Sequence, residues 1–315
     1  MIQVSGYGAL NATSSIAPIE FERRELGEKD ILIDILYCGV CHSDIHMARS
    51  EWGPSVYPIV PGHEIVGKIS QIGSGVTQFK VSEMAGVGVF IDSCRECPSC
   101  KKGQEQYCDE GFTPTYNGYY RDGVTPTFGG YSTQYVVDEA FTLHIPFTEE
   151  LERVAPLLCA GITTYSPLKY AGVGKGHKVA VLGLGGLGHM GVKFAVSMGA
   201  EVTMLSTSPS KENDAKMLGA HHFALSTDKD QMKALRGQFD FILNTVAAKY
   251  DLNKFLDLLT VEGKMLLVGI PPEDNELGSA KLISRRRSII GSNVGGIAET
   301  QEMLDYCAEH NILSD

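Results

Sequence analysis

Hydrophobic and polar residues alternate differently in the two halves of the chain. From about residue 154 onward, short apolar runs are separated by segments long enough for helices. The runs that this pattern predicts to be buried strands are 178–184, 201–206, 222–226, 239–245, 264–270 and 287–294. Strands of this kind, joined by crossover helices, form a parallel sheet. The second half is therefore expected to be a doubly wound α/β domain.

The first 150 residues have a less regular pattern. Strand-like runs at 31–37, 64–72 and 131–137 are interrupted by loops rich in glycine, proline and cysteine, which is typical of irregular β structure with functional loops. After the last predicted strand, the apolar residues of 299–309 are spaced for one face of a helix. A length of 315 residues fits two domains of about 150 residues each.

The charge balance limits the partners. The chain has 27 basic and 38 acidic residues, a net charge of −11, which disfavours binding to nucleic acid or to an anionic membrane surface. The run Arg285–Arg287 is therefore interpreted as a solvated turn. The longest apolar stretch, 179–192, is too short for a spanning helix, which needs about 20 residues. A small-molecule partner is favoured.

The N-terminus predicts a cytoplasmic location, because it lacks a basic start followed by an apolar core. In that reducing compartment, eight cysteines indicate metal-binding or catalytic thiols rather than disulfides.

Four of the cysteines form a C-x2-C-x2-C-x7-C pattern, with members Cys94, Cys97, Cys100 and Cys108. Four thiolates so close together can surround one tetrahedral ion, as in structural zinc sites. An iron–sulfur cluster is the alternative, but the ferredoxin pattern ends in C-x3-C-P, whereas the last gap here is longer and Asp109 follows. Zinc is favoured.

A second cysteine motif, Cys38-Gly-Val-Cys41-His42, matches both a haem attachment signature and a redox pair. Haem attachment needs an exported protein, and the redox motif belongs at a helix start after a βαβ strand. Cys41 has a third interpretation, because Cys41, His63 and Cys159 could together supply two thiolates and one imidazole for an open, catalytic zinc site.

A glycine-rich loop follows the strand at 178–184 and precedes a predicted helix at 189–198. Its residues are Gly183, Leu184, Gly185, Gly186, Leu187 and Gly188. The first glycine allows a tight turn, the second lets the backbone approach a pyrophosphate, and the last allows close packing of helix on strand. This context predicts a dinucleotide-binding site.

The end of the next strand indicates which dinucleotide binds. NAD-dependent enzymes place a carboxylate there to bind the ribose hydroxyl. This chain instead has hydroxyl groups and a cation: Ser206, Thr207, Ser208 and Lys211. Hydroxyls and a cation suit a 2′-phosphate, so NADP is favoured. A serine-rich loop that simply caps the following helix explains the same residues, and both interpretations can hold together.

Taken together, these motifs resemble those of zinc-dependent medium-chain alcohol dehydrogenases. GVCHSDIH, PGHEIVGKI, the four-cysteine loop, LLCAGITTY and LGLGGLGHMGVKFA occur in the family's order. STSPSK, and the stretch from EWGP to YPIVPGHE, are similar to the cinnamyl-alcohol-dehydrogenase branch. The resemblance implies a GroES-like catalytic domain, a Rossmann domain, two zinc ions per chain, and NADP(H)-dependent interconversion of primary alcohols and aldehydes.

The resemblance also implies roles for individual residues. Cys41, His63 and Cys159 match the catalytic zinc ligands, and Glu64 matches an alternate ligand. Asp44 matches the carboxylate that orients the ligating histidine, a role also expected on physical grounds.

Further roles follow from the same resemblance. Ser43 and His46 match a proton relay, and Trp52 falls at a substrate-pocket position, although a packed aromatic is its simpler interpretation. The residues expected near the cofactor, besides the glycine-rich loop, are His42, Thr163, Thr245, Gly269, Ser292 and Asn293.

The resemblance predicts a catalytic domain with both zinc sites over 1–159, an NADP-binding domain over 160–297, and a helix over 298–315 that starts a return to the catalytic domain. Family members continue past this helix with further strands. We therefore expect an uncovered sheet edge or core face in the first domain, and lower stability than that of an intact relative. The strand at 288–294 resembles the one through which family members form homodimers.

One turn departs from the family. Relatives carry Gly-Asp-Arg-Val where this chain has Ser82-Glu83-Met84-Ala85, so a strained turn and weaker local packing are expected.

Three other functions are considered. A polyol dehydrogenase is disfavoured by the NADP-type residues and by Trp52, and a zinc-free quinone reductase is disfavoured by Cys41, His63 and Cys159. The third is a truncated product that binds zinc and NADP(H) with little turnover.

Overall fold

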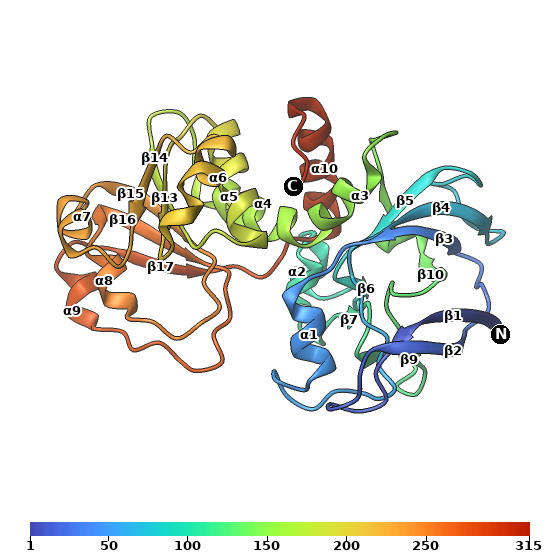
Figure 1. The fold of residues 1–315 in the computed structure, drawn as a ribbon. Coiled ribbons are helices and arrows are strands. Elements are labelled where there is room, and N and C mark those ends of the chain that lie inside the picture. Colours follow the sequence, from blue (N-terminus) through green and yellow to red (C-terminus); the bar gives the residue numbers. More distant parts are fainter. The chain divides into compact units, whose positions relative to one another are not determined.

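The chain divides into two units within helix α4 (Ala160–Ala171) in the computed structural model, which describes residues 1–315. One unit comprises 1–162 and 294–314, and the other comprises 163–293 with Asp315. The predicted boundaries, after residues 159 and 297, lie near these points. Figure 1 shows the elements of both units in sequence colours. None of the helices is both long and apolar enough to cross a membrane.

The second unit is built on a six-stranded sheet in which every pair of neighbouring strands is parallel. Its strands are β12 (Lys178–Leu182), β13 (Glu201–Ser206), β14 (His222–Leu225), β15 (Phe239–Asn244), β16 (Leu259–Leu267) and β17 (Ser288–Gly291). Their order is β14-β13-β12-β15-β16-β17, so the direction of winding reverses between β12 and β15. The predicted doubly wound sheet is confirmed.

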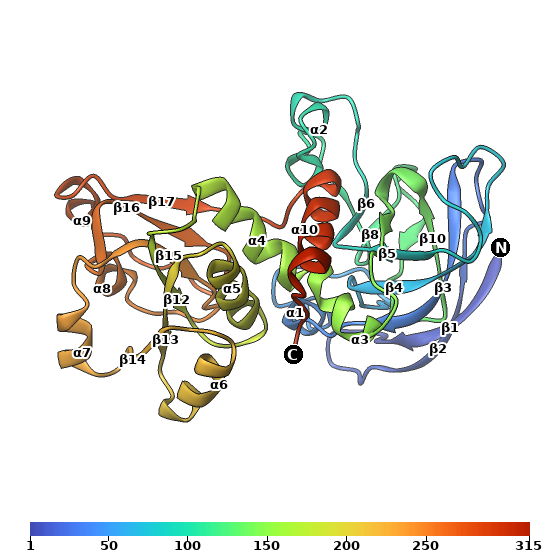
Figure 2. The ribbon, with the colours of Figure 1, turned by 90° about the horizontal axis from the view of Figure 1, so that it is seen from above.

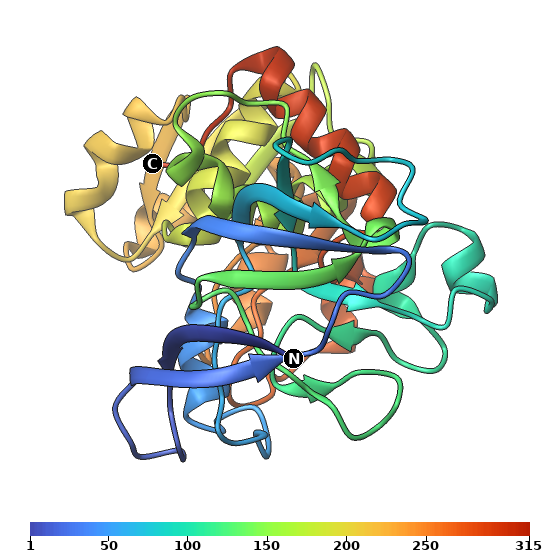
Figure 3. The same cartoon turned by 90° about the vertical axis from the view of Figure 1, so that its right-hand side faces the viewer.

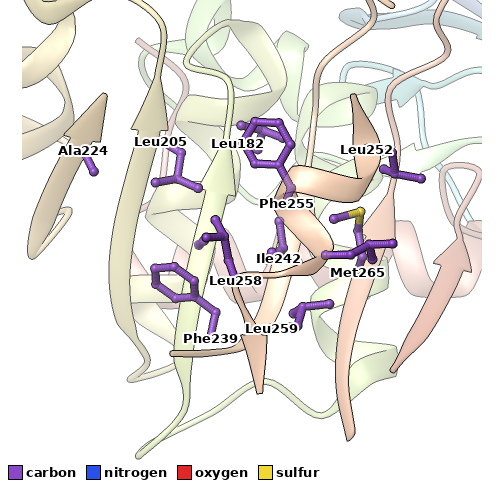
Figure 4. Packing of buried hydrophobic residues seen from close by; sticks show 12 residues of the cluster. Leu182, Leu205, Ala224, Phe239, Ile242, Leu252, Phe255, Leu258, Leu259 and Met265 are labelled. Atoms are coloured by element: carbon purple, nitrogen blue, oxygen red, sulfur yellow. The ribbon is translucent and has the colours of Figure 1, made fainter. Parts of the chain in front are cut away.

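Helices connect these strands. They are α5 (Gly186–Ser197), η4 (Pro209–Lys211), α6 (Glu212–Met217), α7 (Lys229–Ala234), α8 (Leu252–Leu256) and α9 (Ser279–Ile283). Residues two apart in a strand share a face of the sheet, so Ala180 and Leu182 of β12 both join a core that α8 covers through Leu252 and Phe255. Figure 4 shows this packing, with Met265 contributed by β16.

The first unit contains a five-stranded sheet with the order β10-β3-β4-β5-β11, in which all neighbours are antiparallel. Its strands are β3 (Asp30–Cys38), β4 (Ile65–Ile72), β5 (Met84–Val87), β10 (Gln134–Asp138) and β11 (Leu143–His144). Three two-stranded sheets accompany it: β1 (Ile2–Gly8) with β2 (Ala17–Arg23), β6 (Phe90–Asp92) with β7 (Thr113–Pro114), and β8 (Gly118–Tyr119) with β9 (Pro126–Thr127). Irregular β structure is thus confirmed for this half.

The strand predicted at 131–137 begins later, at Gln134. The preceding backbone is bonded elsewhere, because the amide of Tyr131 donates to Pro61 O at 2.9 Å and that of Thr133 donates to Ser5 O at 3.0 Å. These two amides thus bond to segments outside the sheet, although Thr133 O still accepts from Ile35 N of β3 at 2.9 Å.

The helical segments of the first unit are short except for the last. They are α1 (His42–Ala48), α2 (Pro98–Lys101), η1 (Glu105–Tyr107), η2 (Glu139–Phe141), α3 (Leu151–Val154), η3 (Ala155–Leu158) and α10 (Ile297–His310). The side-chain amide of Gln301 on α10 bonds both backbone groups of His144 on β11, at 2.8 and 3.1 Å. Helix α10, predicted at 299–309, therefore satisfies part of the edge of the five-stranded sheet. Figures 2 and 3 show this helix in red from two further directions.

Apolar side chains line an open groove on the first unit. Val40 is 78% exposed, Tyr7 57% and Leu36 51%, whereas most side chains of this size pack inside a protein.

The interpretation of Arg285–Arg287 as a solvated turn is wrong for Arg287. Its side chain is buried, and its guanidinium donates to Leu259 O at 2.6 Å. Arg287 thus satisfies a carbonyl at the start of β16, whereas Arg285 and Arg286 are exposed as expected, and Arg286 pairs with Glu262.

The turn before β5 is strained as expected. Ser82 has a φ of 77°, which lies in the left-handed region where a side chain costs free energy and glycine does not. Ser82 is exposed, so its side chain gains little from packing.

We predict that Ser82→Gly raises the free energy of unfolding by about 1 kcal/mol, because it removes the Cβ from a left-handed residue. Urea denaturation of the purified protein measures this. Ser82→Ala is the control, since it keeps the Cβ and is expected to give no gain. Equal stability of the glycine and alanine variants would contradict the prediction.

Candidate metal and cofactor sites

Four potential metal ligands meet inside the first unit. The ligand atoms of Cys41, His63, Glu64 and Cys159 all lie within 4.8 Å of one another. Cys41 precedes α1, His63 and Glu64 precede β4, and Cys159 follows η3. His63, Glu64 and Cys159 are buried. The structure thus brings together all the residues predicted for a catalytic metal.

A buried carboxylate organises this cluster. Asp44 Oδ1 lies 3.1 Å from His63 Nδ1 and accepts from the amide of Gly62 at 3.0 Å, while Oδ2 accepts from the amide of Cys41 at 3.0 Å. An imidazole that donates Nδ1–H to a carboxylate leaves Nε2 free to bind a metal. Asp44 therefore lies where the predicted orienting carboxylate belongs.

The two thiols of the cluster lie 3.9 Å apart. A hydrogen bond with the Cys159 thiol and the adjacent His63 imidazole lower the pKa of Cys41, although burial opposes the shift. The thiolate is the form that binds metals. Cys41 is therefore the readier metal ligand, whereas the hydrogen bond with Cys41 and burial raise the pKa of Cys159, so a bound cation would have to displace the proton of that thiol.

Glu64 supplies the clearest test of whether a cation fits. Its Oε2 is buried and has no hydrogen-bond partner, and burial raises the pKa of this carboxyl to about 8. A buried carboxylate without a partner is costly, and a divalent cation between the thiols would remove that cost. Space for this oxygen exists because residue 39 is glycine, where a Cβ would lie 1.9 Å from Glu64 Oε2.

The predicted relay residues lie on α1 beside this cluster. Ser43 Oγ is 3.4 Å from Cys41 Sγ, and His46 Nδ1 is paired with the Glu51 carboxylate. The His46 ring stacks between His42, at 5.0 Å, and Trp52, at 4.6 Å. Trp52 is half-buried and packs against His46.

The four-cysteine loop forms a second cluster, with all four sulfurs within 4.8 Å of one another. Backbone amides point at these sulfurs: Cys97 N to Cys94 Sγ at 3.3 Å, Cys100 N to Cys97 Sγ at 3.4 Å, and Cys94 N to Cys108 Sγ at 3.3 Å. Amides from Asp109 and Cys100 lower the pKa of Cys97. Burial raises the pKa of Cys100 to about 12, so a cation would have to displace its proton. Four sulfurs this close together, with amides directed at them, fit a tetrahedral zinc ion.

Cys38 belongs to neither cluster, and the protein has no disulfides. The arrangement therefore favours the metal interpretation of Cys41 over a Cys38–Cys41 redox pair.

The glycine-rich loop of the second unit has the expected shape. Gly183 turns with a φ of 92°, and a Cβ on Gly188 would lie 1.9 Å from Gly183 O. A Cβ on Gly185 or Gly186 would meet nothing within 4 Å. Open space above two glycines at a helix start suits a pyrophosphate.

The other predicted cofactor residues of the second unit follow the carboxyl ends of its parallel strands, where ligands of such sheets bind. Ser206 ends β13 and residues 207–211 follow it, Thr245 follows β15, Gly269 follows β16, and Ser292 and Asn293 follow β17. The Thr245 hydroxyl donates to Leu182 O at 2.9 Å, and the Lys211 ammonium donates to Leu184 O. Thr163 lies elsewhere, buried on α4, and His42 is an exposed residue of the first unit.

Comparison with known families agrees with both halves. Residues 27–147 match the alcohol dehydrogenase GroES-like domain, and residues 186–309 match the zinc-binding dehydrogenase domain. The chain belongs to the zinc-binding alcohol dehydrogenase family. The sites described above are thus those of an oxidoreductase fold, as the resemblance implies.

Several named members of this family are similar over almost the whole chain. NADP-dependent alcohol dehydrogenase C of Mycobacterium tuberculosis is 50% identical, over 99% of this chain and 90% of the relative. Aldehyde reductase YahK of Escherichia coli is 50% identical over 100% and 90%. A probable mannitol dehydrogenase of Fragaria ananassa is 50% identical over 99% and 87%.

Two solved structures of the family are also close. A cinnamyl alcohol dehydrogenase of Sorghum bicolor aligns with a TM-score of 0.96 at 42% identity, over 100% of this chain and 90% of that one. The CAD of Helicobacter pylori complexed with NADP(H) aligns with a TM-score of 0.94 at 45% identity, with the same coverage.

Sequence reasoning missed two aromatic residues beside the dehydrogenase metal cluster. The hydroxyl of Tyr131 donates to Asp44 Oδ2 at 2.9 Å, and the ring of Tyr116 stacks on that of His63 at 5.7 Å. The two glycines before Tyr131 indicate that the backbone there passes close to another segment. No local pattern in the sequence connects Tyr131 to Asp44.

Proposed function

We propose that the chain is a zinc-dependent alcohol dehydrogenase that interconverts primary alcohols and aldehydes with NADP(H), with aromatic or allylic substrates among them. The observation that carries this proposal is the buried cluster of Cys41, His63 and Cys159, with His63 held by Asp44. The names of its relatives as NADP-dependent alcohol dehydrogenase and aldehyde reductase support it.

The chain's own residues divide the work. Cys41, His63 and Cys159 would hold a catalytic zinc, with Glu64 as an alternate ligand, and the four-cysteine loop would hold a structural zinc. Zinc supplies a Lewis acid for the alcohol or aldehyde oxygen, and NADP(H) carries the hydride.

Protons would move along α1. The Ser43 hydroxyl, beside Cys41, exchanges a proton with the substrate oxygen, and His46 passes it to solvent while the Glu51 carboxylate holds the imidazole in place. Trp52 stacks on His46, so it would offer a flat apolar surface to an aromatic substrate at the same place.

In the second unit, the loop at Gly183–Gly188 would hold the pyrophosphate. Ser206, Thr207, Ser208 and Lys211 would bind the 2′-phosphate of NADP, because three hydroxyls and one cation follow β13 where an NAD-type carboxylate is missing. Thr245, Gly269, Ser292 and Asn293 would border the remaining cofactor, with His42 and Thr163.

A polyol substrate is the second candidate, since a 50% identical relative is named as a probable mannitol dehydrogenase. The two candidate substrate classes are distinguished by comparing the rates of oxidation of mannitol and of cinnamyl alcohol. We place the protein in the cytoplasm, because both clusters need reduced thiols.

The proposed function is tested by measuring metal content and turnover on the same preparations. Wild type is expected to hold two zinc ions and to oxidise NADPH with cinnamaldehyde. Cys159→Ala is expected to hold one, and to lose activity by about 100-fold or more, because an active-site ligand is removed. Cys307→Ala is the control, since Cys307 is buried on α10 outside both clusters. Metal and NADPH binding without turnover in wild type would contradict the proposal.

Lys211 is expected to set the cofactor preference. Lys211→Ala should raise the KM for NADPH by about 10- to 100-fold, the cost of one hydrogen bond to a charged group, and leave the KM for NADH unchanged. Lys216→Ala, which removes an exposed lysine paired with Glu212 on α6, is the matched control. Equal effects on the two cofactors would contradict this assignment.

We also propose that two chains pair through β17, because it is the edge strand of the six-stranded sheet and has one free side. Light scattering is expected to give twice the mass of a single chain. A mass equal to one chain would rule out this dimer.

A further inference from the structure

The environment of Asp44 contains a donor that comes from a distant segment. Asp44 accepts four hydrogen bonds, two on each carboxylate oxygen. Three donors belong to segments that carry metal ligands: Cys41 N, Gly62 N and His63 Nδ1. The fourth is the phenol of Tyr131, which donates to Oδ2 at 2.9 Å. The Tyr116 phenol also faces this carboxylate, and burial and the Asp44 charge raise its pKa, but the phenol of Tyr131 is the one that lies 2.9 Å from an Asp44 oxygen.

Backbone bonds tie the Tyr131 segment to the segment that leads into His63. The amides of Gly129, Gly130 and Tyr131 donate to Val60 O at 2.6 Å, Gly62 O at 2.8 Å and Pro61 O at 2.9 Å, respectively. The Tyr131 phenol and the His63 imidazole therefore extend from two segments whose backbones are joined by consecutive hydrogen bonds.

The approach of these two segments leaves no room for side chains. A Cβ on Gly129 would lie 2.3 Å from Pro61 O, and one on Gly130 would meet a third segment, 2.8 Å from Cys38 Sγ at the end of β3. Gly62, with a φ of 104°, faces Tyr131 N, where a Cβ would lie 2.8 Å away. Glycine at these positions is thus a requirement of the contact that places the phenol.

A buried arginine holds the other side of the Tyr131 segment. Arg23 is 5% exposed, and its guanidinium donates to Phe128 O at 2.7 Å, Gly129 O at 2.8 Å and Gln134 O at 2.7 Å. The same guanidinium lies over the ring of Tyr135, 4.4 Å from its centroid. The guanidinium of arginine is planar and carries five N–H donors, so it can hold several backbone carbonyls at once.

We propose that Tyr131 is a positioning residue for the catalytic zinc, acting through Asp44. Its phenol fixes the plane of the carboxylate, the carboxylate fixes the ring of His63, and Arg23 fixes the segment from which the phenol reaches. The inference rests on the proposed function in one respect, the assignment of zinc to Cys41, His63 and Cys159. Loss of such a partner costs metal affinity, because the ligand must then be ordered when the metal binds.

The test measures metal release from the full-length protein, because release reports the site without turnover. Wild type loaded with zinc is expected to give up two equivalents to a coloured chelator in two phases, one for each cluster. Tyr131→Phe removes one oxygen and keeps the ring. It is expected to speed one phase by about tenfold, to leave the phase of the four-cysteine loop unchanged, and to alter the visible spectrum of the cobalt-substituted protein.

Tyr135→Phe is the matched control. It also removes a single phenol oxygen, one that donates to Thr115 O at 2.7 Å and not to Asp44. Both release phases and the cobalt spectrum are expected to remain those of wild type, while its thermal melt, like that of Tyr131→Phe, records the loss of one buried hydrogen bond.

The outcomes separate this inference from the proposed function. If wild type releases two equivalents and Tyr131→Phe matches it in both phases and in the cobalt spectrum, the inference is overturned and the proposed function stands. Faster release of both zinc equivalents also overturns the inference, because the substitution then destabilises the protein as a whole and not the catalytic site alone. If wild type binds only the equivalent that Cys97→Ser removes, the proposed function fails, and the inference fails with it.

Discussion

The buried carboxylate of Asp44 is the group on which the metal cluster depends. A carboxylate in such a place costs several kcal/mol unless it is paired and bonded. Burial alone would raise the pKa of Asp44, but the His63 imidazole and the amides of Cys41 and Gly62 hold it below its usual value. Because its donors come from the start of α1, from the turn at residues 61–63 and from the loop at Tyr131, bonding this carboxylate fixes three separate segments at once.

This arrangement connects fold to chemistry in a specific way. The short helix α1 begins at the residue after Cys41 and is capped by Asp44, which accepts from the Cys41 amide. The residue whose side chain caps the start of the helix is therefore also the one that orients the ligand, and His63 gains a fixed ring plane. Glu64 differs from Asp44, because its Oε2 has no hydrogen-bond partner in the protein. A bound cation would supply that partner.

Local patterns in the sequence were sufficient for much of the fold and of both sites. The four cysteines lie within fifteen residues of chain, the glycine-rich loop lies between a strand and a helix, and each needs only its own neighbours to form. The alternation of strands and helices predicts the parallel sheet for the same reason. Ser82 is a different case, since its strain was expected from the family resemblance, in which a glycine stands at this turn.

Contacts between distant residues were not predictable in this way. Tyr131 reaches Asp44, and Gln301 bonds His144, through surfaces that exist only after the chain has folded. The late start of β10 has the same origin, because the amides of Tyr131 and Thr133 are already bonded outside the sheet. Arg287 is a further example: next to two other arginines it resembles a surface turn, yet the carbonyls of β16 give it buried partners.

The most direct test of this account is a crystal structure of the protein with anomalous data at the zinc edge. The account predicts a peak bonded to Cys41 Sγ, Cys159 Sγ and His63 Nε2, at about 2.3 Å from sulfur and about 2.0 Å from nitrogen, while Nδ1 of His63 still donates to Asp44. No zinc peak at this cluster, or a zinc bound through Nδ1 with Asp44 turned away, would contradict it.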